Sequence, residues 1–441
     1  FGGQTAINLA LPLSDSLTHL STLGLHLVIE GSSPDAIDEA SDRERFEEFA
    51  ARNGLRMPRG STATTPDEVR QAAHEIGYPV LIRPSYVLGG RGMEILSNDK
   101  QLEAYMEEAF LAPDRPLLID EYLGNAIELD VDAVCDGEEV LVGAIMEHLE
   151  EAGIHSGDST CFIPPQNIPE HVLAEVEDWT RKIGIELGIR GCYNIQFAIR
   201  DEVLHVLEVN PRGSRTFPFV AKATGVPLAR IAARLALGEK LSELNVPEPQ
   251  TDAVCVKAPV FPFIKLRGLD PAPGPEMKST GEVMGSHARP AAAYLKARLA
   301  TELPVPVEGG VYITVKDGDK LAIIDEARRL QEMGFTLYAT RGTAHVLRDV
   351  GGLDVQTCYR IAERRSPDAL DLMRQGKIHL VINTPRSTGG AVLDGNMMRR
   401  LAVELNIPFV TTMAGAHMEV EAIDEAMKGM PEPRLLEIGS L

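Results

Sequence analysis

The sequence lacks the features that mark a disulfide-stapled, thiolate-metal or membrane-spanning protein. Its five cysteines lie far apart, so no CxxC pair is present to bind a metal or act in redox chemistry. Their scatter and odd number favour a reduced, cytoplasmic protein. No apolar run reaches the roughly 18 residues that a membrane helix needs, and no basic-then-apolar stretch resembles a signal peptide. The cysteines are Cys135, Cys161, Cys192, Cys255 and Cys358.

The chain is also short of positive charge, with 43 Lys and Arg against 65 Asp and Glu and a formal net charge of −22. A general nucleic-acid binder needs a basic surface, so this class is disfavoured. An anionic small substrate is compatible with the charge, because a local basic pocket can lie within an acidic surface. The 44% of hydrophobic residues is typical of a globular protein, and 441 residues suggest two to four domains.

The first 37 residues predict the tail of a small α/β domain, with a helix, a strand at 25–29 and the turn Gly31–Pro34. The sequence opens on a glycine turn, Phe1–Gln4, and a turn needs a segment before it. We therefore expect a missing strand upstream and a cut through a longer enzyme. Whether the chain is a fragment or the product of a split gene is open at this point.

From about residue 304 onward, strands and helices alternate. The proline-rich stretch Pro247–Pro275 and the linker Leu303–Pro306 precede this region. The alternation predicts a small doubly wound domain with a parallel sheet over residues 304–441. Its expected strands are Gly310–Val315, Phe335–Ala339, His379–Asn383 and Pro408–Thr412.

A glycine-rich loop follows an apolar strand that ends near Arg83. The loop contains Gly89, Gly90 and Gly92, and strand character resumes at Met93. A Walker P-loop would instead run from glycines through Lys and Ser/Thr into a helix, so this loop is of another kind. Glycine N–H groups can approach an anion closely. Because glycine loops are common, the loop alone does not predict a phosphate site. The neighbouring Arg83 strengthens that prediction.

A hairpin in the middle of the chain brings oxygen donors together. Glu208 and Asn210 are two apart on a strand, so both side chains point to one face. If the turn centres near Glu202, Gln196 lies opposite Glu208 on that face. Hard cations such as Mg²⁺ prefer oxygen ligands and usually keep few protein ligands. The alternative is a solvent-facing polar edge.

Two arginines, Arg212 and Arg215, follow the hairpin directly. Guanidinium groups suit carboxylate and phosphate oxygens. A cation site beside two guanidiniums is what phosphoryl transfer needs. The alternative is a pair of surface arginines after a turn.

Taken together, these strings resemble the ATP-grasp family, in which two sheets clamp ATP under a glycine-rich flap. More narrowly, they resemble the C-terminal half of the carbamoyl-phosphate synthase large chain, over nearly the whole sequence. The resemblance implies an α/β and α+β multidomain protein, with a partial pre-ATP-grasp domain (1–37), an ATP-grasp clamp (38–303) and a methylglyoxal-synthase-like regulatory domain (304–441). The matching strings are Arg83–Arg91, Met146–His148, Gly153–Ser159, Gln196–Phe197, Glu208–Arg212, Lys222–Pro227 and Ser279–Gly285.

The resemblance implies ATP- and Mg²⁺- or Mn²⁺-dependent phosphorylation of carbamate to carbamoyl phosphate, a ligase step that feeds arginine and pyrimidine synthesis. Arg212, Arg215 and Arg83 would act on the transferring phosphoryl group, and Gln196, Glu208 and Asn210 would bind the metal. Glu121 stands where the family can have His, so its role would depend on its backbone. Positions matched to nucleotide binding are Arg43, Arg83, Gly89, Gly90, Glu121, Leu123, Glu128, Gly153, Ile154, His155, Ser156, Gln196 and Glu208.

In the regulatory domain, the resemblance implies a nucleotide effector such as UMP or IMP. The string after the strand at 335–339 predicts a phosphate site at a helix N-terminus, or else an ordinary capped helix. Pro385 stands where the family often has Thr, which leaves the effector's identity open. The matched positions are Thr314, Lys320, Thr340, Thr343, Arg360, Asn383 and Thr384.

The resemblance also implies partners: an N-terminal half that supplies carbamate and a glutaminase small subunit that supplies ammonia. The enzyme would then be of the glutamine-hydrolysing type, cytoplasmic, with neither nucleic acid nor membrane as a partner. Two alternatives stay open from the sequence. One is another ATP-grasp carboxylase or ligase, and the other is a nucleotide-sensing regulatory subunit without catalysis.

Overall fold

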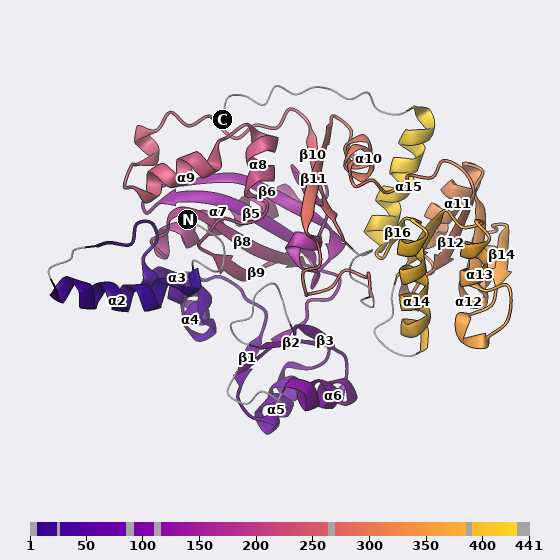
Figure 1. Cartoon of the computed structure of the whole chain (residues 1–441), viewed down its shortest axis with the longest axis horizontal. Helices are drawn as coiled ribbons and strands as arrows, with labels where there is room; N and C mark the ends of the chain where they lie inside the picture. The colour runs from indigo at the N-terminus through magenta and orange to yellow at the C-terminus, as the bar shows by residue number, and fades with distance from the viewer. Residues whose placement is uncertain are drawn as a thin grey trace. The chain divides into compact units, whose positions relative to one another are not determined.

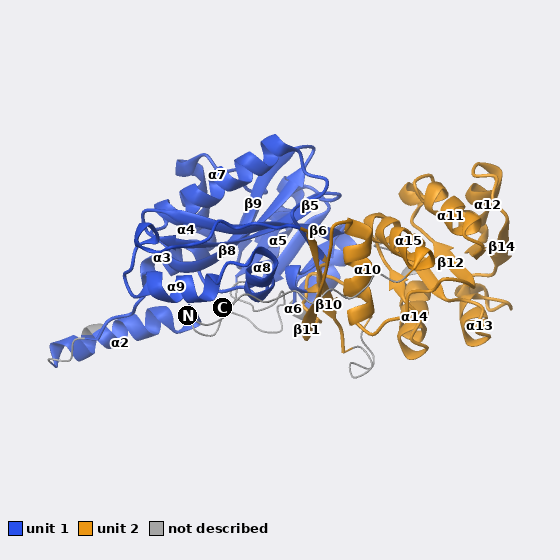
Figure 2. Ribbon diagram, turned by 90° about the horizontal axis from the view of Figure 1, so that it is seen from above, with its two compact units in different colours: residues 1–157, 161–252, 436–441 blue, residues 158–160, 253–435 orange. Residues whose placement is uncertain are grey.

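The computed structural model describes residues 7–23, 27–84, 92–109, 116–262, 270–384 and 390–429. The predicted site residues Gly89 and Gly90 lie outside these ranges, as does Pro385. The chain divides into two compact units (Figure 2). Among the described residues, the first contains those up to Gly157 together with Cys161–Asp252, and the second contains Asp158–Thr160 and those from Ala253 onward.

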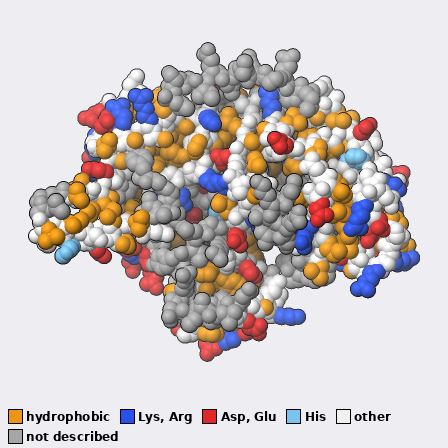
Figure 3. All heavy atoms as spheres, in the orientation of Figure 1, with side chains coloured by type: hydrophobic (Ala, Val, Ile, Leu, Met, Phe, Trp, Pro, Cys, Tyr) orange, Lys and Arg blue, Asp and Glu red, His pale blue; other side chains and the backbone are white. Residues whose placement is uncertain are grey.

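The first unit begins with helices. Ser33 accepts a hydrogen bond from the backbone N–H of Ala36 and caps one of them, as expected of an N-cap serine. The strand predicted at 25–29 is wrong for the residues described, since 27–30 are irregular. Leu11 and Leu13 of the first helix are exposed, and hydrophobic side chains are seen on the molecular surface in Figure 3. The helices are α2 (Ala10–Thr22), α3 (Pro34–Ser41) and α4 (Arg43–Asn53).

A small antiparallel sheet follows, with strand order β1-β4-β2-β3. Strands β1, β2 and β3 are labelled in Figure 1. Apolar residues such as Ile82 and Ile119 point from it into a core shared with two helices. Thr65 and Glu68 form a capping box that starts the first of these helices. The elements are β1 (Gly60–Ala63), α5 (Pro66–Ile76), β2 (Val80–Pro84), β3 (Glu94–Leu96), α6 (Asp99–Ala109) and β4 (Leu117–Glu121).

The larger sheet of the first unit runs in the order β7-β6-β5-β8-β9, all antiparallel. Side chains alternate along its strands, so that one face is apolar and packs against α7 around Trp179. The opposite face carries polar side chains from β5, β8 and β9. The elements are β5 (Ile127–Asp136), β6 (Val140–Glu151), β7 (Cys161–Ile163), α7 (Glu170–Glu186), β8 (Arg190–Arg200), β9 (Val203–Asn210), α8 (Phe217–Thr224) and α9 (Leu228–Ala236).

The second unit opens with an antiparallel pair and a helix, β10 (Val254–Val260), β11 (Gly281–His287) and α10 (Pro290–Ala300). After them comes a parallel sheet of order β14-β13-β12-β15-β16, so the predicted parallel α/β architecture is confirmed. The remaining elements are β12 (Gly310–Thr314), α11 (Ile323–Glu332), β13 (Thr336–Thr340), α12 (Arg341–Asp349), β14 (Val355–Cys358), α13 (Ala369–Arg374), β15 (Leu380–Asn383), α14 (Gly390–Glu404), β16 (Phe409–Val410) and α15 (Met413–Lys428).

A buried carboxylate ties α10 to α15 within the second unit. Glu419 is 0% exposed and accepts hydrogen bonds from the Tyr294 hydroxyl at 2.9 Å and from Arg298 Nε at 3.0 Å. A charge taken out of water needs such partners. Among the described residues of the whole chain, no helix has the length and apolar character to cross a membrane.

Candidate nucleotide, metal and effector sites

The hairpin of β8 and β9 places Gln196 opposite Glu208, as the sequence pattern predicts, because its turn lies at Asp201 and Glu202. Asn210 donates from Nδ2 to Glu208 Oε1 at 2.9 Å, and Gln196 Nε2 donates to Ser156 Oγ at 2.7 Å. Within the described residues, no donor reaches Gln196 Oε1 or Glu208 Oε2. These two oxygens lie on neighbouring strands and suit a hard divalent cation.

Arg212 extends this set. Its Nη2 donates to Asn210 Oδ1 at 2.9 Å, so the guanidinium is oriented by the residue that also holds Glu208. Arg215 lies three residues further along the same loop and is partly exposed. An amide, a carboxylate and a guanidinium thus follow one another along the end of β9.

The loop after β6 contains the predicted nucleotide residues Gly153, Ile154, His155 and Ser156. Its start is tied to β5, because Gly153 N–H donates to Glu128 Oε1 at 2.9 Å. Gly153 has φ of +92°, and a Cβ there would lie 2.8 Å from Tyr122 Cε2, so the position needs glycine. His155 Nδ1 accepts a hydrogen bond from Gly157 N–H at 3.0 Å. This bond holds the imidazole ring against the backbone of its own loop.

Glu121, at the end of β4, has its carboxylate engaged by two arginines. Arg59 Nε lies 3.0 Å from Oε2, and Arg200 Nη2 lies 3.1 Å from Oε1. Burial alone would raise the pKa of Glu121, but the two guanidiniums outweigh it and lower that pKa. Leu123 is buried two residues later. The side chain of Glu121 is therefore already paired, which leaves backbone groups of this segment for a ligand.

The predicted phosphate ligands Arg43 and Arg83 differ in their surroundings. Arg43 Nη2 forms an ion pair with Asp120 Oδ1 at 2.8 Å and its Nε one with Glu47 at 2.5 Å. Arg83 Nε, in contrast, is buried and has no hydrogen-bond partner among the described residues. A buried donor without a partner is costly, so this atom fits an anion at the end of β2.

Sequence reasoning missed a buried cluster of ionisable side chains on the same face of β5. His148 lies between Glu128 Oε2 at 3.4 Å and Asp130 Oδ2 at 3.2 Å. Burial opposes protonation of this ring, but the neighbouring acidic groups raise its pKa well above the usual value. Asp132, two residues along the strand, is 0% exposed, and burial raises its pKa to about 6. The alternation of side chains along β5, which places Glu128, Asp130 and Asp132 on one face, was the sequence signal that could have indicated this cluster.

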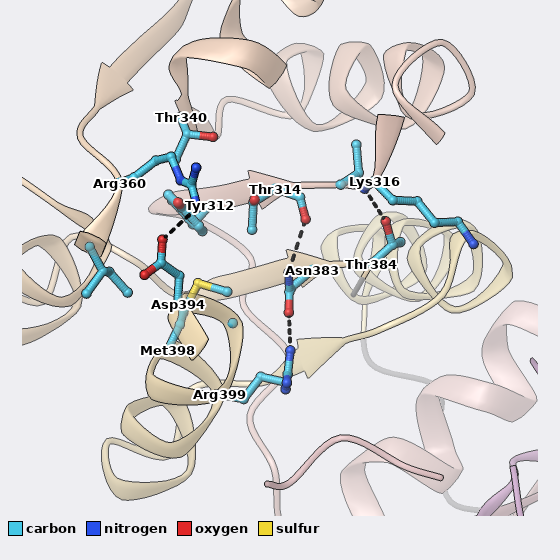
Figure 4. A pocket seen from close by; sticks show the side chains of 13 residues that line it. Tyr312, Thr314, Lys316, Thr340, Arg360, Asn383, Thr384, Asp394, Met398 and Arg399 are labelled. Atoms are coloured by element: carbon cyan, nitrogen blue, oxygen red, sulfur yellow. Dashed lines mark hydrogen bonds and ion pairs between the residues drawn. The ribbon is translucent and has the colours of Figure 1, made fainter. Parts of the chain in front are cut away.

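In the second unit, a pocket lies at the carboxyl ends of three adjacent parallel strands (Figure 4). Thr340 ends β13, Thr314 ends β12 and Asn383 ends β15, which is where open α/β sheets bind ligands. Arg360 and Thr384 also line the pocket. Five of the seven predicted effector residues are thus brought together.

The other two predicted effector residues do not line the pocket. Lys320 Nζ forms an ion pair with Asp317 Oδ1 at 2.6 Å, and Thr343 is buried in α12. The pocket instead contains charged residues that the sequence did not single out. These are Lys316, Asp394, which lies 3.4 Å from Arg360, and the buried Arg399, whose Nη1 donates to Asn383 Oδ1 at 2.5 Å.

Two domain families match the chain. Residues 42–244 match the carbamoyl-phosphate synthase L chain, ATP binding domain, and residues 322–411 match the MGS-like domain. The carbamoyl phosphate synthase large chain, C-terminal section, of Methanocaldococcus jannaschii is 48% identical over 441 residues, covering 97% of this chain and 70% of that protein. The large chain of Methanothrix thermoacetophila is 49% identical over 431 residues, but this chain spans only 40% of its length.

Solved structures share the fold of about two thirds of the chain. The biotin carboxylase domain of Hydrogenobacter thermophilus 2-oxoglutarate carboxylase, in complex with MgADP, ADP and bicarbonate, has a TM-score of 0.53 at 19% identity, covering 68% of this chain and 76% of that one. Carboxyaminoimidazole ribonucleotide synthase from Aspergillus clavatus, complexed with ATP, has a TM-score of 0.53 at 15% identity, covering 65% and 78%. At these identities the likeness concerns the fold alone.

Proposed function

The chain belongs to the carbamoyl-phosphate synthase large-chain family, and on that premise we propose that it phosphorylates carbamate with ATP to give carbamoyl phosphate and ADP. Its fold combines an ATP-grasp clamp with an MGS-like domain. The chain spans 40% of the full-length large chain and 70% of the C-terminal section. We propose domain bounds of 1–37, 38–303 and 304–441.

The observation that carries the proposal is the cluster formed by Gln196 of β8 with Glu208, Asn210 and Arg212 at the end of β9. Gln196 and Glu208 would hold Mg²⁺ or Mn²⁺ through the oxygens that no described donor reaches, with Asn210 beside them. When bound, the cation neutralises phosphate charge. Arg212 and Arg215 orient carbamate and the phosphoryl oxygens, and Arg83 binds the nucleotide phosphates from β2.

The remaining nucleotide contacts come from strand ends. Glu128, whose carboxylate also contacts Gly153 and His148, holds the ribose hydroxyls, and the backbone around Glu121 and Leu123 binds adenine. Gly153, Ile154, His155 and Ser156 line the pocket, while Arg43 fixes the adjoining strand through Asp120. No covalent nucleophile is required, because positioning and charge neutralisation carry phosphoryl transfer.

We propose further that the chain works with an N-terminal half that supplies carbamate and with a glutaminase subunit that supplies ammonia. The whole enzyme is then a glutamine-hydrolysing, cytoplasmic ligase of arginine and pyrimidine synthesis. The strong similarity to large chains and to a separate C-terminal section supports the first partner. A second, regulatory role follows from the pocket of β12, β13 and β15, which would take UMP or IMP.

The reverse reaction tests the catalytic proposal. The chain with ADP, carbamoyl phosphate and MgCl₂ should form ATP, and removal of Mg²⁺ or the change Glu208→Ala should abolish this. Glu138→Ala is the matched control, because Glu138 lies in the turn between β5 and β6 with a 76% exposed side chain. A folded chain that binds ADP·Mg²⁺ yet makes no ATP, even with the N-terminal half supplied, contradicts the proposal.

Calorimetry tests the effector site. UMP or IMP should release or absorb heat on binding, and Arg360→Ala should weaken the binding. Arg365→Ala is the control, because its guanidinium stacks on Tyr359, 4.1 Å from the ring centre, and does not line the pocket. No heat with either nucleotide at millimolar concentration would remove the regulatory proposal.

A further inference from the structure

Asp132 is a carboxylate that the chemistry described so far does not use. It lies on β5 with 0% of the residue exposed, in register with Asn194 of β8. Three side-chain donors reach it. Asn194 Nδ2 lies 2.9 Å from Oδ1, Ser214 Oγ lies 2.7 Å from Oδ1, and Thr216 Oγ1 lies 2.7 Å from Oδ2.

Two of these donors belong to the loop that follows β9. Ser214 stands between Arg212 and Arg215 in the sequence, and Thr216 is the last residue before α8. The two hydroxyls also lie 2.8 Å from each other, and Ser214 Oγ accepts the backbone N–H of Phe217 at 3.2 Å. One carboxylate on β5 therefore fixes the loop at two points, across the intervening strand β8.

A carboxylate in this place is costly to the fold. Burial disfavours its charged form, and the hydroxyl and amide donors only partly compensate, so the pKa of Asp132 stands at about 6. A hydrophobic residue would pack on β5 at lower cost. A buried carboxylate bonded to Ser214 and Thr216, in the loop that carries two site arginines, favours a role in the site.

We propose that Asp132 is a positioning residue for phosphoryl transfer, which holds the loop 211–216 so that Arg212 and Arg215 face the transferring group. The inference rests on the proposed function of these arginines. Asp132 touches neither substrate nor metal in this account, and it acts through Ser214 and Thr216. Its loss should therefore impair turnover and carbamoyl phosphate binding while leaving adenine and ribose binding intact.

Asp132→Asn in the full chain is the test variant, because it keeps the shape of the side chain. The kcat of ATP formation should fall by about tenfold to a hundredfold, as for a misplaced reacting group, and the KM for carbamoyl phosphate should rise. The KM for ADP should stay within about twofold, since positioning of the arginines does not alter nucleotide binding. Unchanged kcat, or an equal rise in both KM values, overturns the proposal.

Asp136→Asn is the matched control. Asp136 is also a buried carboxylate of β5, but it accepts hydrogen bonds from the backbone of Glu138, Glu139 and Leu241, at 2.8, 2.7 and 2.8 Å, away from the arginine loop. Its variant should show neither the kcat loss nor the KM split. The same split in Asp136→Asn would show a general effect of disturbing β5 and overturn the assignment.

A second readout does not depend on activity. In Asp132→Asn, amide hydrogen exchange at Phe217 should accelerate by about tenfold or more because its acceptor Ser214 is released. Thr216→Val provides the same test with one anchor removed, if Asp132→Asn does not fold. Faster exchange supports the anchor even if the parent chain makes no ATP, which would count against the proposed function alone. Unchanged exchange in both variants overturns the inference.

Discussion

Arg399 of α14 holds Asp270 by a two-point ion pair, with Nε 2.9 Å from Oδ1 and Nη2 2.5 Å from Oδ2. The same guanidinium donates to Asn383, which lines the pocket at the end of β15. A pocket side chain is thus joined through one buried arginine to the segment that precedes β11. This contact lies wholly within the second unit.

The same segment of the second unit also holds Asp158. Lys278 Nζ donates to the carbonyl of Asp270 at 3.2 Å, and the N–H groups of Lys278 and Ser279 donate to the Asp158 carboxylate at 2.7 and 2.9 Å. Asp158 is 0% exposed and directly follows Gly157 in the chain. Asp158 is therefore held by the segment before β11, within the second unit.

Asp270→Asn tests the ion pair. Removing one partner of a fully buried pair costs about 3–5 kcal/mol, but the Asp270 side chain is 30% exposed, which reduces the cost. We expect a lower melting temperature for the second unit and weaker UMP binding, because Asn383 loses its support. Asp67→Asn is the control, since that carboxylate is 96% exposed. Equal calorimetric traces for the two variants would contradict the prediction.

The free energy of unfolding of the first unit should depend on pH because of Asp132. Burial raises its pKa from 3.8 to about 6, so the folded state keeps a proton that the unfolded chain releases. Stability from this group is therefore present at low pH and declines as the pH rises from about 4 to about 6. At about 1.4 kcal/mol per pKa unit, the decline is about 3 kcal/mol.

Asp132→Asn should remove that decline. The urea midpoint of the variant, relative to the midpoint of the parent chain, should therefore be higher at pH 7.5 than at pH 4.5. Fluorescence of Trp179 can follow the transition, because it is the sole tryptophan and packs on the same sheet. A difference between the two midpoints that does not change with pH would contradict the assigned pKa.

Arg212→Lys should separate charge from geometry. The lysine keeps the positive charge but cannot donate to Asn210 and to a phosphoryl oxygen in the planar arrangement of a guanidinium. We expect kcat for ATP formation to fall by about a hundredfold, with ADP binding unchanged by calorimetry. Arg181→Lys serves as control, because Arg181 lies on α7 and donates to the carbonyl of Val140. Wild-type turnover in Arg212→Lys would contradict the proposed role of Arg212 in phosphoryl transfer.

Local patterns in the sequence predict the parts of the site that lie close together along the chain. Gln196 and Glu208 belong to one hairpin, so the two-residue period and the turn position were enough to pair them. The alternation of strands and helices likewise predicts the parallel sheet that ends in Thr314, Thr340 and Asn383. The strand at 25–29 is wrong over the described residues 27–30, because strand propensity depends strongly on tertiary context.

Contacts between distant segments could not be predicted in this way. Asp132 and Ser214 are 82 residues apart, and Asp270 and Arg399 are 129 apart. Each pair depends on the order of strands in a sheet or on the packing of a connecting segment, neither of which has a local signal. The same holds for Glu121, whose two arginine partners come from other elements.

The central claim is that the chain moves a phosphoryl group between carbamoyl phosphate and a bound nucleotide. The most direct measurement uses carbamoyl phosphate labelled with ³²P, together with ADP and Mg²⁺. The account predicts label in the γ-phosphate of ATP with the parent chain and with Glu138→Ala, and none with Glu208→Ala. A folded parent chain that binds ADP but leaves ATP unlabelled, with the N-terminal half present, would contradict it.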